Sequence, residues 1–178
     1  MKKLFVLLVV FVLSFTFYGC SLASQGLSNQ DFLRIHIRAN SNLEVDQNVK
    51  YAVKTAIVNY LTPFLAGAQT KQQALAIVKS QLDNINKVAD NVLISNGFTY
   101  TCSATVCQEV FPTRYYDGVV LASGLYDALI INLGSGKGDN WWCVVYPPLC
   151  FVPSQNDTDG VVFKWKILEI INNWKNNR

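Results

Sequence analysis

The spacing of the apolar residues changes along this chain, and the change limits the possible folds more than any other feature. Between residues 45 and 92, apolar side chains recur at steps of three and four, which is the spacing of one helix face. From residue 98 onward, aromatic and β-branched residues are interrupted by short groups of turn formers, which is typical of strands. Leu33–Arg38 precedes the helical region, and its alternation of apolar and polar residues predicts another strand. This order predicts an α+β fold with an N-terminal strand, an antiparallel helical pair and then a mainly antiparallel sheet.

Capping residues and helix breakers set the expected ends of the two helices. Ser41 and Thr70 each stand three residues before a Glu or a Gln, and this spacing predicts a capping box at both helix N-termini. Pro63 is expected to end the first helix, because proline has no amide hydrogen and its ring clashes with the preceding turn. Gly97 is expected to end the second helix as a left-handed C-cap. Since only a few residues join the two helices, they should pack antiparallel.

The remaining strands and the tail complete one expected domain. Asp117–Gly118 is a turn signal, and the apolar segments 119–121 and 125–133 that follow it predict strands. Gly134–Gly138 lacks the Ser or Thr that follows the lysine of a phosphate loop, so we interpret it as a flexible hairpin end. Isoleucines and a tryptophan at helical spacing in the tail favour a C-terminal helix. Residues 31–178 are therefore expected to form a single α+β domain.

The first 23 residues have the composition of an export signal or a membrane anchor. Lys2 and Lys3 precede an uncharged apolar segment, Leu4–Tyr18, and this order is typical of a sequence that enters a membrane. Small residues allow cleavage after Ala23, whereas Cys20 offers a poorer site for lipid attachment. A segment that is not cleaved would anchor the chain. We therefore expect a secreted protein that stays membrane-associated only if this segment is retained.

The charge balance argues against a nucleic-acid partner. The chain has 15 Lys and Arg residues and 12 Asp and Glu residues. Two of the lysines lie in the export segment, so residues 21–178 keep 13 basic and 12 acidic residues, a net charge of +1. Phosphate binding requires a concentrated positive field, which this net charge does not produce. No feature of the sequence indicates a cofactor.

Four cysteines remain after the export segment, an even number in a chain expected outside the cytoplasm. Their spacing leaves three disulfide pairings open. The local arrangement joins Cys102 to Cys107 and Cys143 to Cys150, and two prolines between the last two cysteines favour that second bridge. A zinc site is disfavoured, because the spacings lack a CxxC motif and the chain has one histidine. No metal is therefore expected.

Candidate catalytic residues are few. The single histidine, His36, lies between two arginines on the polar face of the first predicted strand, so we interpret it as a solvated side chain rather than a catalytic base. Pairs of carboxylates hydrolyse glycans, which leaves a secreted cell-wall hydrolase, acting on glycan or peptide, as the alternative function. The acidic residues of the strand-rich half are Glu109, Asp117, Asp127 and Asp139. None belongs to a recognisable motif, so no catalytic residue is assigned and we do not expect an enzyme.

An aromatic segment is the strongest candidate for a binding site. Trp141 and Trp142 are adjacent on a predicted strand, so their side chains should point to opposite faces and one indole can stay exposed. An exposed tryptophan in a braced loop suits a hot spot in a protein interface. We therefore name Asn140, Trp141, Trp142 and Tyr146 as candidate partner-binding residues.

Several segments, in their order along the chain, also carry a resemblance to a known family. They are Arg34–Ile37 with Ala39–Ser41, Tyr60–Pro63, Phe111–Arg114, Gly124–Leu129 and Gly138–Phe151. These residues resemble the stage II sporulation protein R family over about Leu33 to Val152, and the Asn-Trp-Trp-Cys to Pro-Pro-Leu-Cys block is the most specific part. The tail at 161–171 is similar as well. Cys102 and Cys107 depart from the family pattern.

The resemblance implies a signalling protein of endospore formation. Members of the family are expected to be made in the forespore and exported into the intermembrane space between forespore and mother cell. There they are thought to activate a membrane-embedded aspartic protease that processes the precursor of a mother-cell sigma factor. The family has no established active site, so the resemblance assigns no catalytic residue to this chain.

Overall fold

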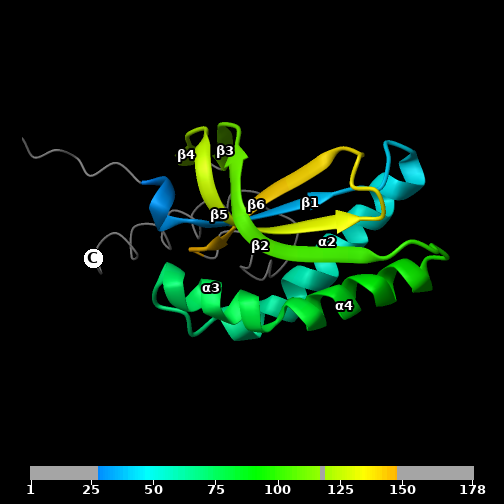
Figure 1. Ribbon diagram of the computed structural model, residues 1–178, viewed down its shortest axis with the longest axis horizontal. Coiled ribbons are helices and arrows are strands. Elements are labelled where there is room, and N and C mark those ends of the chain that lie inside the picture. Colours follow the sequence, from blue (N-terminus) through cyan, green and yellow to red (C-terminus); the bar gives the residue numbers. More distant parts are fainter. Residues whose placement is uncertain (1–27, 117–118, 148–178) are drawn as a thin grey trace, which may run out of the picture.

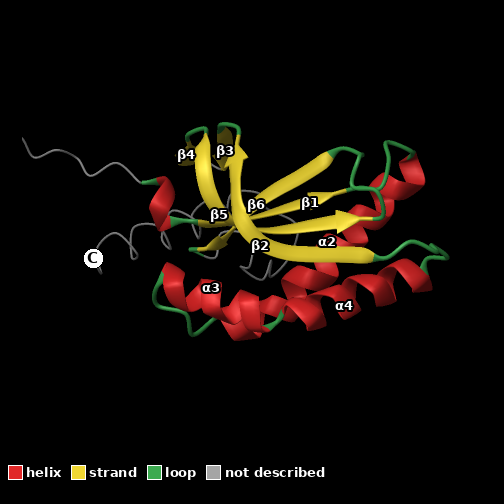
Figure 2. Cartoon of the chain, viewed as in Figure 1, coloured by secondary structure: helices red, strands yellow, loops and turns green. Residues whose placement is uncertain are grey.

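The computed structural model describes residues 28–116 and 119–147. These residues form the predicted α+β fold, in which helices and strands occupy separate layers (Figure 2). The predicted export segment, the Asp117–Gly118 turn and the predicted C-terminal helix lie outside the described residues. Within the described residues, no helix is both long and apolar enough to span a membrane.

Three α-helices, a short 3-10 helix and six strands make up the described part of the chain. In order they are η1 (Asn29–Asp31), β1 (Leu33–Arg38), α2 (Glu44–Leu65), α3 (Lys71–Ser80), α4 (Leu82–Ser95), β2 (Cys102–Phe111), β3 (Arg114–Tyr116), β4 (Val119–Leu121), β5 (Gly124–Leu133) and β6 (Asn140–Tyr146). The strands alternate in sequence with turn formers as expected, and the first strand has the predicted bounds.

Four strands form the main sheet in the order β2-β5-β1-β6. The central strands β1 and β5 are parallel, whereas the two outer pairs, β2 with β5 and β1 with β6, are antiparallel. The short strands β3 and β4 form a separate antiparallel pair. They continue the register of the β2–β5 pair, and β2 itself curves (Figure 1), so we call residues 102–116 and 119–133 the bent hairpin.

The three helices cover one face of the main sheet, and we call this side the helix face. Leu33, Ile35 and Ile37 of β1 point toward the helices and are fully buried among their apolar side chains. Helix α2 packs against α4, and the two run in opposite directions (Figure 1). Burial of apolar side chains between these two layers is the main source of stability.

The opposite side of the sheet, which we call the helix-free face, carries a second and smaller core. Phe111, Tyr126, Ile130 and Val144 pack there with Leu121 of the β3–β4 pair. Polar side chains of β1 emerge on the same face, because successive side chains of a strand point to opposite sides. This face therefore combines an apolar floor with buried polar groups.

The first helix differs from its predicted ends. Pro63 does not terminate α2, which continues to Leu65, because Leu61 and Leu65 are buried against the sheet and hold the last turn in place. Ser41 does not form the predicted capping box. Its hydroxyl group accepts a hydrogen bond from the Leu43 amide and donates to Asp46 at 2.5 Å, so the N-cap position falls to Leu43.

The second predicted helix is divided into α3 and α4 at Gln81. The Gln81 side chain accepts a hydrogen bond from the Tyr60 hydroxyl group of α2 at 2.5 Å. The break allows each of the two helices to direct its own apolar stripe toward the sheet. As predicted, Thr70 caps α3 by accepting from the Gln73 amide, and Gly97 ends α4 with a positive φ of 81°.

The loop Gly134–Gly138 is not a hairpin end, because β5 and β6 are not neighbours but flank β1. It crosses the end of β1 and is fixed there by hydrogen bonds. The Gly138 amide donates to the Ala39 carbonyl group at 2.8 Å, and the Ser135 amide donates to Asn40 Oδ1 at 2.9 Å. An added Cβ atom at Gly138 would lie 2.2 Å from the Ser41 carbonyl oxygen, so this close crossing requires glycine.

Candidate functional site

The polar residues of β1 are buried, which contradicts the interpretation of a solvated polar face. Arg34 is 0% exposed and His36 is 4% exposed. Both lie on the helix-free face, where the bent hairpin and β6 cover them with aromatic side chains. The alternation predicts the two faces correctly, but a local pattern does not show that the second face is also covered.

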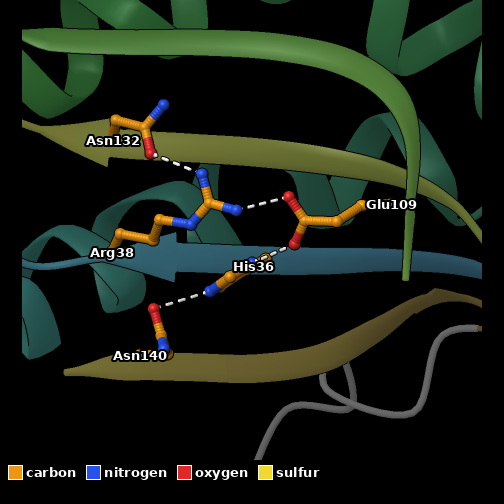
Figure 3. Close-up of polar contacts among 5 residues, drawn as sticks. All are labelled: His36, Arg38, Glu109, Asn132 and Asn140. Carbon is orange, nitrogen blue, oxygen red and sulfur yellow. Dashed lines mark hydrogen bonds and ion pairs between the residues drawn. The ribbon is translucent and has the colours of Figure 1, made fainter. Parts of the chain in front are cut away.

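Polar residues from all four strands of the main sheet meet on this face (Figure 3). His36 Nδ1 lies 2.5 Å from Glu109 Oε1, and His36 Nε2 lies 2.8 Å from Asn140 Oδ1. Arg38 donates to the second carboxylate oxygen of Glu109 and, at 3.2 Å, to Asn132 Oδ1. We call these five residues the polar network. Its carboxylate sits between two basic side chains and neutralises charge that burial would otherwise disfavour.

The arrangement of the polar network is structural rather than nucleophilic. Both ring nitrogens of His36 already have partners, and both partner atoms are oxygens. A doubly protonated ring satisfies both contacts, while a 180° turn of the Asn140 amide would suit the neutral ring. In either state neither nitrogen is free to take a proton from a hydroxyl or thiol group, as nucleophilic catalysis requires.

Arg34 occupies an aromatic cage beside the polar network. Its guanidinium carbon lies 4.2 Å from the ring centre of Phe111 and 4.9 Å from that of Tyr126. One nitrogen donates to the Tyr116 hydroxyl group at 2.6 Å. Burial lowers the pKa of Arg34, and the two tyrosines partly oppose this effect. The ring faces and the phenol therefore stabilise a buried cation through cation–π contacts.

The candidate partner-binding residues are divided between the two faces. Asn140 and Trp142 lie on the helix-free face, where Trp142 stacks on His36 with ring centres 5.2 Å apart. Trp141 lies on the helix face beside Lys54 of α2. Tyr146 is buried there and donates to the Gln69 carbonyl group at 2.6 Å. The predicted opposite orientation of the two tryptophans is therefore confirmed, and the structure brings together only Asn140 and Trp142.

Trp142 is a half-buried aromatic side chain that packs beside the polar network. The guanidinium carbon of Arg114 lies 3.9 Å from its ring centre, on a side chain that comes from the bent hairpin. His36 packs against the same indole. The ring is half-buried and held between two cationic or hydrogen-bonding groups, so its orientation is fixed before any partner binds.

The acidic residues considered for hydrolysis do not converge. Glu109 belongs to the polar network on the helix-free face. Asp127 points to the helix face, where Lys71 donates to it at 2.5 Å and lowers its pKa despite partial burial. Asp139 lies in the loop after β5, and Asp117 lies outside the described residues. Glu109 and Asp127 are thus separated by the sheet and cannot act on the same bond.

The cysteines correct one predicted pairing. Cys102 and Cys107 are both free and lie on the same strand, β2. Five residues of extended strand separate their Cα atoms by roughly 17 Å, whereas a disulfide requires about 7 Å or less. The local Cys102–Cys107 bridge is therefore wrong. Cys150 lies outside the described residues, so the Cys143–Cys150 bridge stays a prediction.

The residues that sequence reasoning missed are those that satisfy buried polar groups. The sequence pattern predicts neither the contact of Glu109 with His36 nor the contacts of Arg38 with Glu109 and Asn132. The sequence does contain a signal, because three basic side chains on one face of a strand require a carboxylate if that face is buried. Among the described residues, no group of three or more His, Cys, Asp or Glu side chains could hold a metal ion.

Comparison with known proteins identifies the family. The family model described as stage II sporulation protein R matches residues 29–156, which is more than half of the chain. A curated relative, stage II sporulation protein R of Bacillus subtilis (strain 168), is 33% identical over 124 residues, which cover 70% of this chain and 55% of the relative. The match therefore spans about half the length of that relative. No solved structure matches the chain. The chain belongs to the stage II sporulation protein R family.

Proposed function

We propose that this chain is an exported signal of endospore formation that activates a membrane-embedded aspartic protease of the mother cell. The protease would then process the precursor of a mother-cell sigma factor. Membership of the family supports a role in sporulation. The leading segment of basic and apolar residues supports export into the space between the two membranes.

The observation that carries the proposal of binding is the environment of Trp142. The indole is half-buried, stacked on His36 and covered on one side by the Arg114 guanidinium group. Asn140, which is exposed, lies on the same strand and the same face. A rigid aromatic side chain beside exposed polar groups is the usual composition of a protein-interface hot spot.

Activation by binding requires a difference in affinity between two states of the protease. A ligand that binds both states equally shifts neither. If the helix-free face contacts only the active state, each 1.4 kcal/mol of that contact multiplies the ratio of active to inactive protease by about ten. Complete loss of a hot-spot tryptophan, about 2 kcal/mol or more, should therefore lower the ratio of active to inactive protease by about 30-fold or more.

Trp142→Leu tests the proposal, with Trp141→Leu as the matched control. Each variant replaces the native chain in sporulating cells, where cleavage of the sigma factor precursor is measured together with the amount of signal protein. Trp142→Leu should reduce cleavage strongly at unchanged protein level. Trp141→Leu alters the helix face and should reduce cleavage only as far as it lowers the protein level. Full cleavage with Trp142→Leu at normal protein level overturns the assignment of this face.

Two further variants separate a signal from a hydrolase. Asp127→Asn and Asp139→Asn remove carboxylates that a glycan or peptide hydrolase would use. A binding protein should keep most of its signalling with either change. Loss of signalling with one of them, in a folded protein, together with turnover of peptidoglycan by the purified parent chain, would replace binding by catalysis.

A further inference from the structure

Strand β2 forms one edge of the main sheet, and the first half of this edge is covered by α4. The Cys102 amide donates to Asp90 Oδ1 at 2.6 Å, and the Ala104 amide donates to Asn86 Oδ1 at 2.8 Å. These two amides therefore point away from β5 and toward the helix. Side chains of α4 thus satisfy the outward donors that another strand could otherwise use.

Among the described residues, no helix or strand pairs with the second half of the same edge. Outward amides recur at every second residue of a strand, so those of Val106, Gln108 and Val110 point in the same direction as the amide of Ala104. Within the described part of the chain, no group accepts a hydrogen bond from these three amides. Gln108 is exposed and Val110 is 69% exposed, so the edge is accessible from solvent.

This open segment lacks the basic and proline residues that commonly protect an edge strand. Natural edges carry lysine, proline, bulges or inward charges that prevent pairing with another chain. Residues 103–110 contain no proline, glycine or basic residue, and their single charged side chain, Glu109, is held by His36 and Arg38. Leu125, directly opposite Val110 on β5, is 45% exposed and extends the apolar surface beside the edge.

We propose that residues 106–110 pair antiparallel with the same residues of a second copy of this chain. The two-fold axis lies at Gln108, so that Gln108 faces Gln108 of the partner subunit and Val106 faces Val110 of the partner subunit. This register uses all three open amides of both copies. The pairing joins two four-stranded sheets into one, and it does not depend on the proposed protease partner.

Two observations favour a second copy as the occupant of this edge. In this register α4 of each copy, which covers the edge at residues 102–104, lies outside the paired segment. A shift toward the N-terminus would place the blocked Ala104 amide in the pairing. In addition, no unpaired like charges oppose each other, because Glu109 is already neutralised within its own chain. The strand is therefore complementary to itself in one register.

Association of the full chain, purified in a mild detergent, tests the proposal. Sedimentation from about 10 µM to about 500 µM should show a dimer that forms with rising concentration, as expected for a small interface. Gln108→Lys places two ammonium groups opposite each other and should abolish the dimer. Ser103→Lys, a change at another exposed residue of β2 in the half covered by α4, should leave it intact. This control also distinguishes edge pairing from association of the apolar leader.

Cross-linking tests the register. Gln108→Cys in a Cys107→Ser background should form an intermolecular disulfide, because the two copies of residue 108 lie directly opposite. Thr105→Cys in the same background places the two thiols about 20 Å apart and should not cross-link. Equal cross-linking of both variants, or a dimer that survives Gln108→Lys, overturns the proposal. A chain that stays monomeric but loses signalling with Gln108→Lys also overturns it, and would assign the edge to a strand of another protein.

Discussion

Replacing Glu109 by glutamine tests whether the polar network stabilises the fold. The amide keeps the size of the carboxylate and one acceptor oxygen, but it loses the charge and presents an NH2 group to one of its two donors. Arg38 is the partner that would turn away, because its side chain is 30% exposed and can be solvated. His36, at 4% exposed, would keep the remaining oxygen.

The magnitude follows from these two changes. A hydrogen bond to a charged acceptor contributes about 1 kcal/mol more than one to a neutral acceptor, so the His36 contact should weaken by about that amount. The Arg38 ion pair is partly exposed and therefore screened, and its loss should cost about 0.5–1 kcal/mol. We therefore expect Glu109→Gln to lower the free energy of unfolding by about 1.5–2 kcal/mol. Glu109→Ala should cost more, because the buried His36 Nδ1 atom is then left without a partner.

Urea denaturation followed by tryptophan fluorescence at pH 7 measures this change, provided that unfolding is two-state. Asp83→Asn is the matched control, because it removes an exposed carboxylate in the first turn of α4 and should cost less than about 1 kcal/mol. A free energy for Glu109→Gln within about 0.5 kcal/mol of the parent would refute the reasoning, because the network would then add nothing to stability.

Three further predictions concern other parts of the fold. Gly138→Ala should destabilise the chain by about 1–3 kcal/mol, because the added Cβ atom would lie 2.2 Å from a backbone carbonyl oxygen. Gly67→Ala is the control, because its added Cβ atom would have no neighbour within 4 Å, and thermal unfolding compares the two variants. Iodoacetamide at pH 8 should alkylate the exposed Cys107 and spare Cys102, because burial and the Asp90 charge raise the pKa of Cys102 to about 12. Peptide mass mapping measures the labelling, and equal rates at the two cysteines would contradict this prediction. Burial disfavours ionisation of Asp46, but hydrogen bonds from its neighbours outweigh burial and lower its pKa below 3.8. Its contribution to stability is therefore complete above about pH 4 and is lost as the pH falls through the folded-state pKa, so melting temperatures from pH 5 to pH 2 should fall less steeply in Asp46→Asn.

The sequence predicted those parts of the fold that depend on local periodicity. The alternation at Leu33–Arg38 placed β1 and its two faces correctly, and the helical spacing located the helical layer. The predictions were wrong where contacts between residues distant in sequence determine the ends of a helix. Burial of Leu65 carries α2 past Pro63, and the Gln81 contact with Tyr60 accompanies the break between α3 and α4. No local pattern contains these contacts.

The candidate site shows the same limit in a sharper form. Adjacent tryptophans on a strand must point to opposite faces of the sheet. The placement of Trp141 and Trp142 on different faces was therefore predictable from their positions alone. The partner of His36 was not predictable, because Glu109 is 73 positions away on β2, and β5 lies between β2 and β1 in the sheet. Sequence order gives no register for such a pairing.

The burial of these polar side chains bears on how a partner could use the helix-free face. A surface composed of flexible exposed arginines would have to be ordered on binding, which lowers affinity. Here Arg38 is held by Glu109 and Asn132, and Trp142 is held between Arg114 and His36 before any contact forms. A hot spot requires a side chain whose orientation is fixed before binding. The polar network meets this requirement, because His36 packs against the Trp142 indole and leaves part of the ring accessible. Changes to the polar network should weaken signalling because they alter the orientation of Trp142. A variant of the network that is less stable but signals fully would show that the network only stabilises the fold.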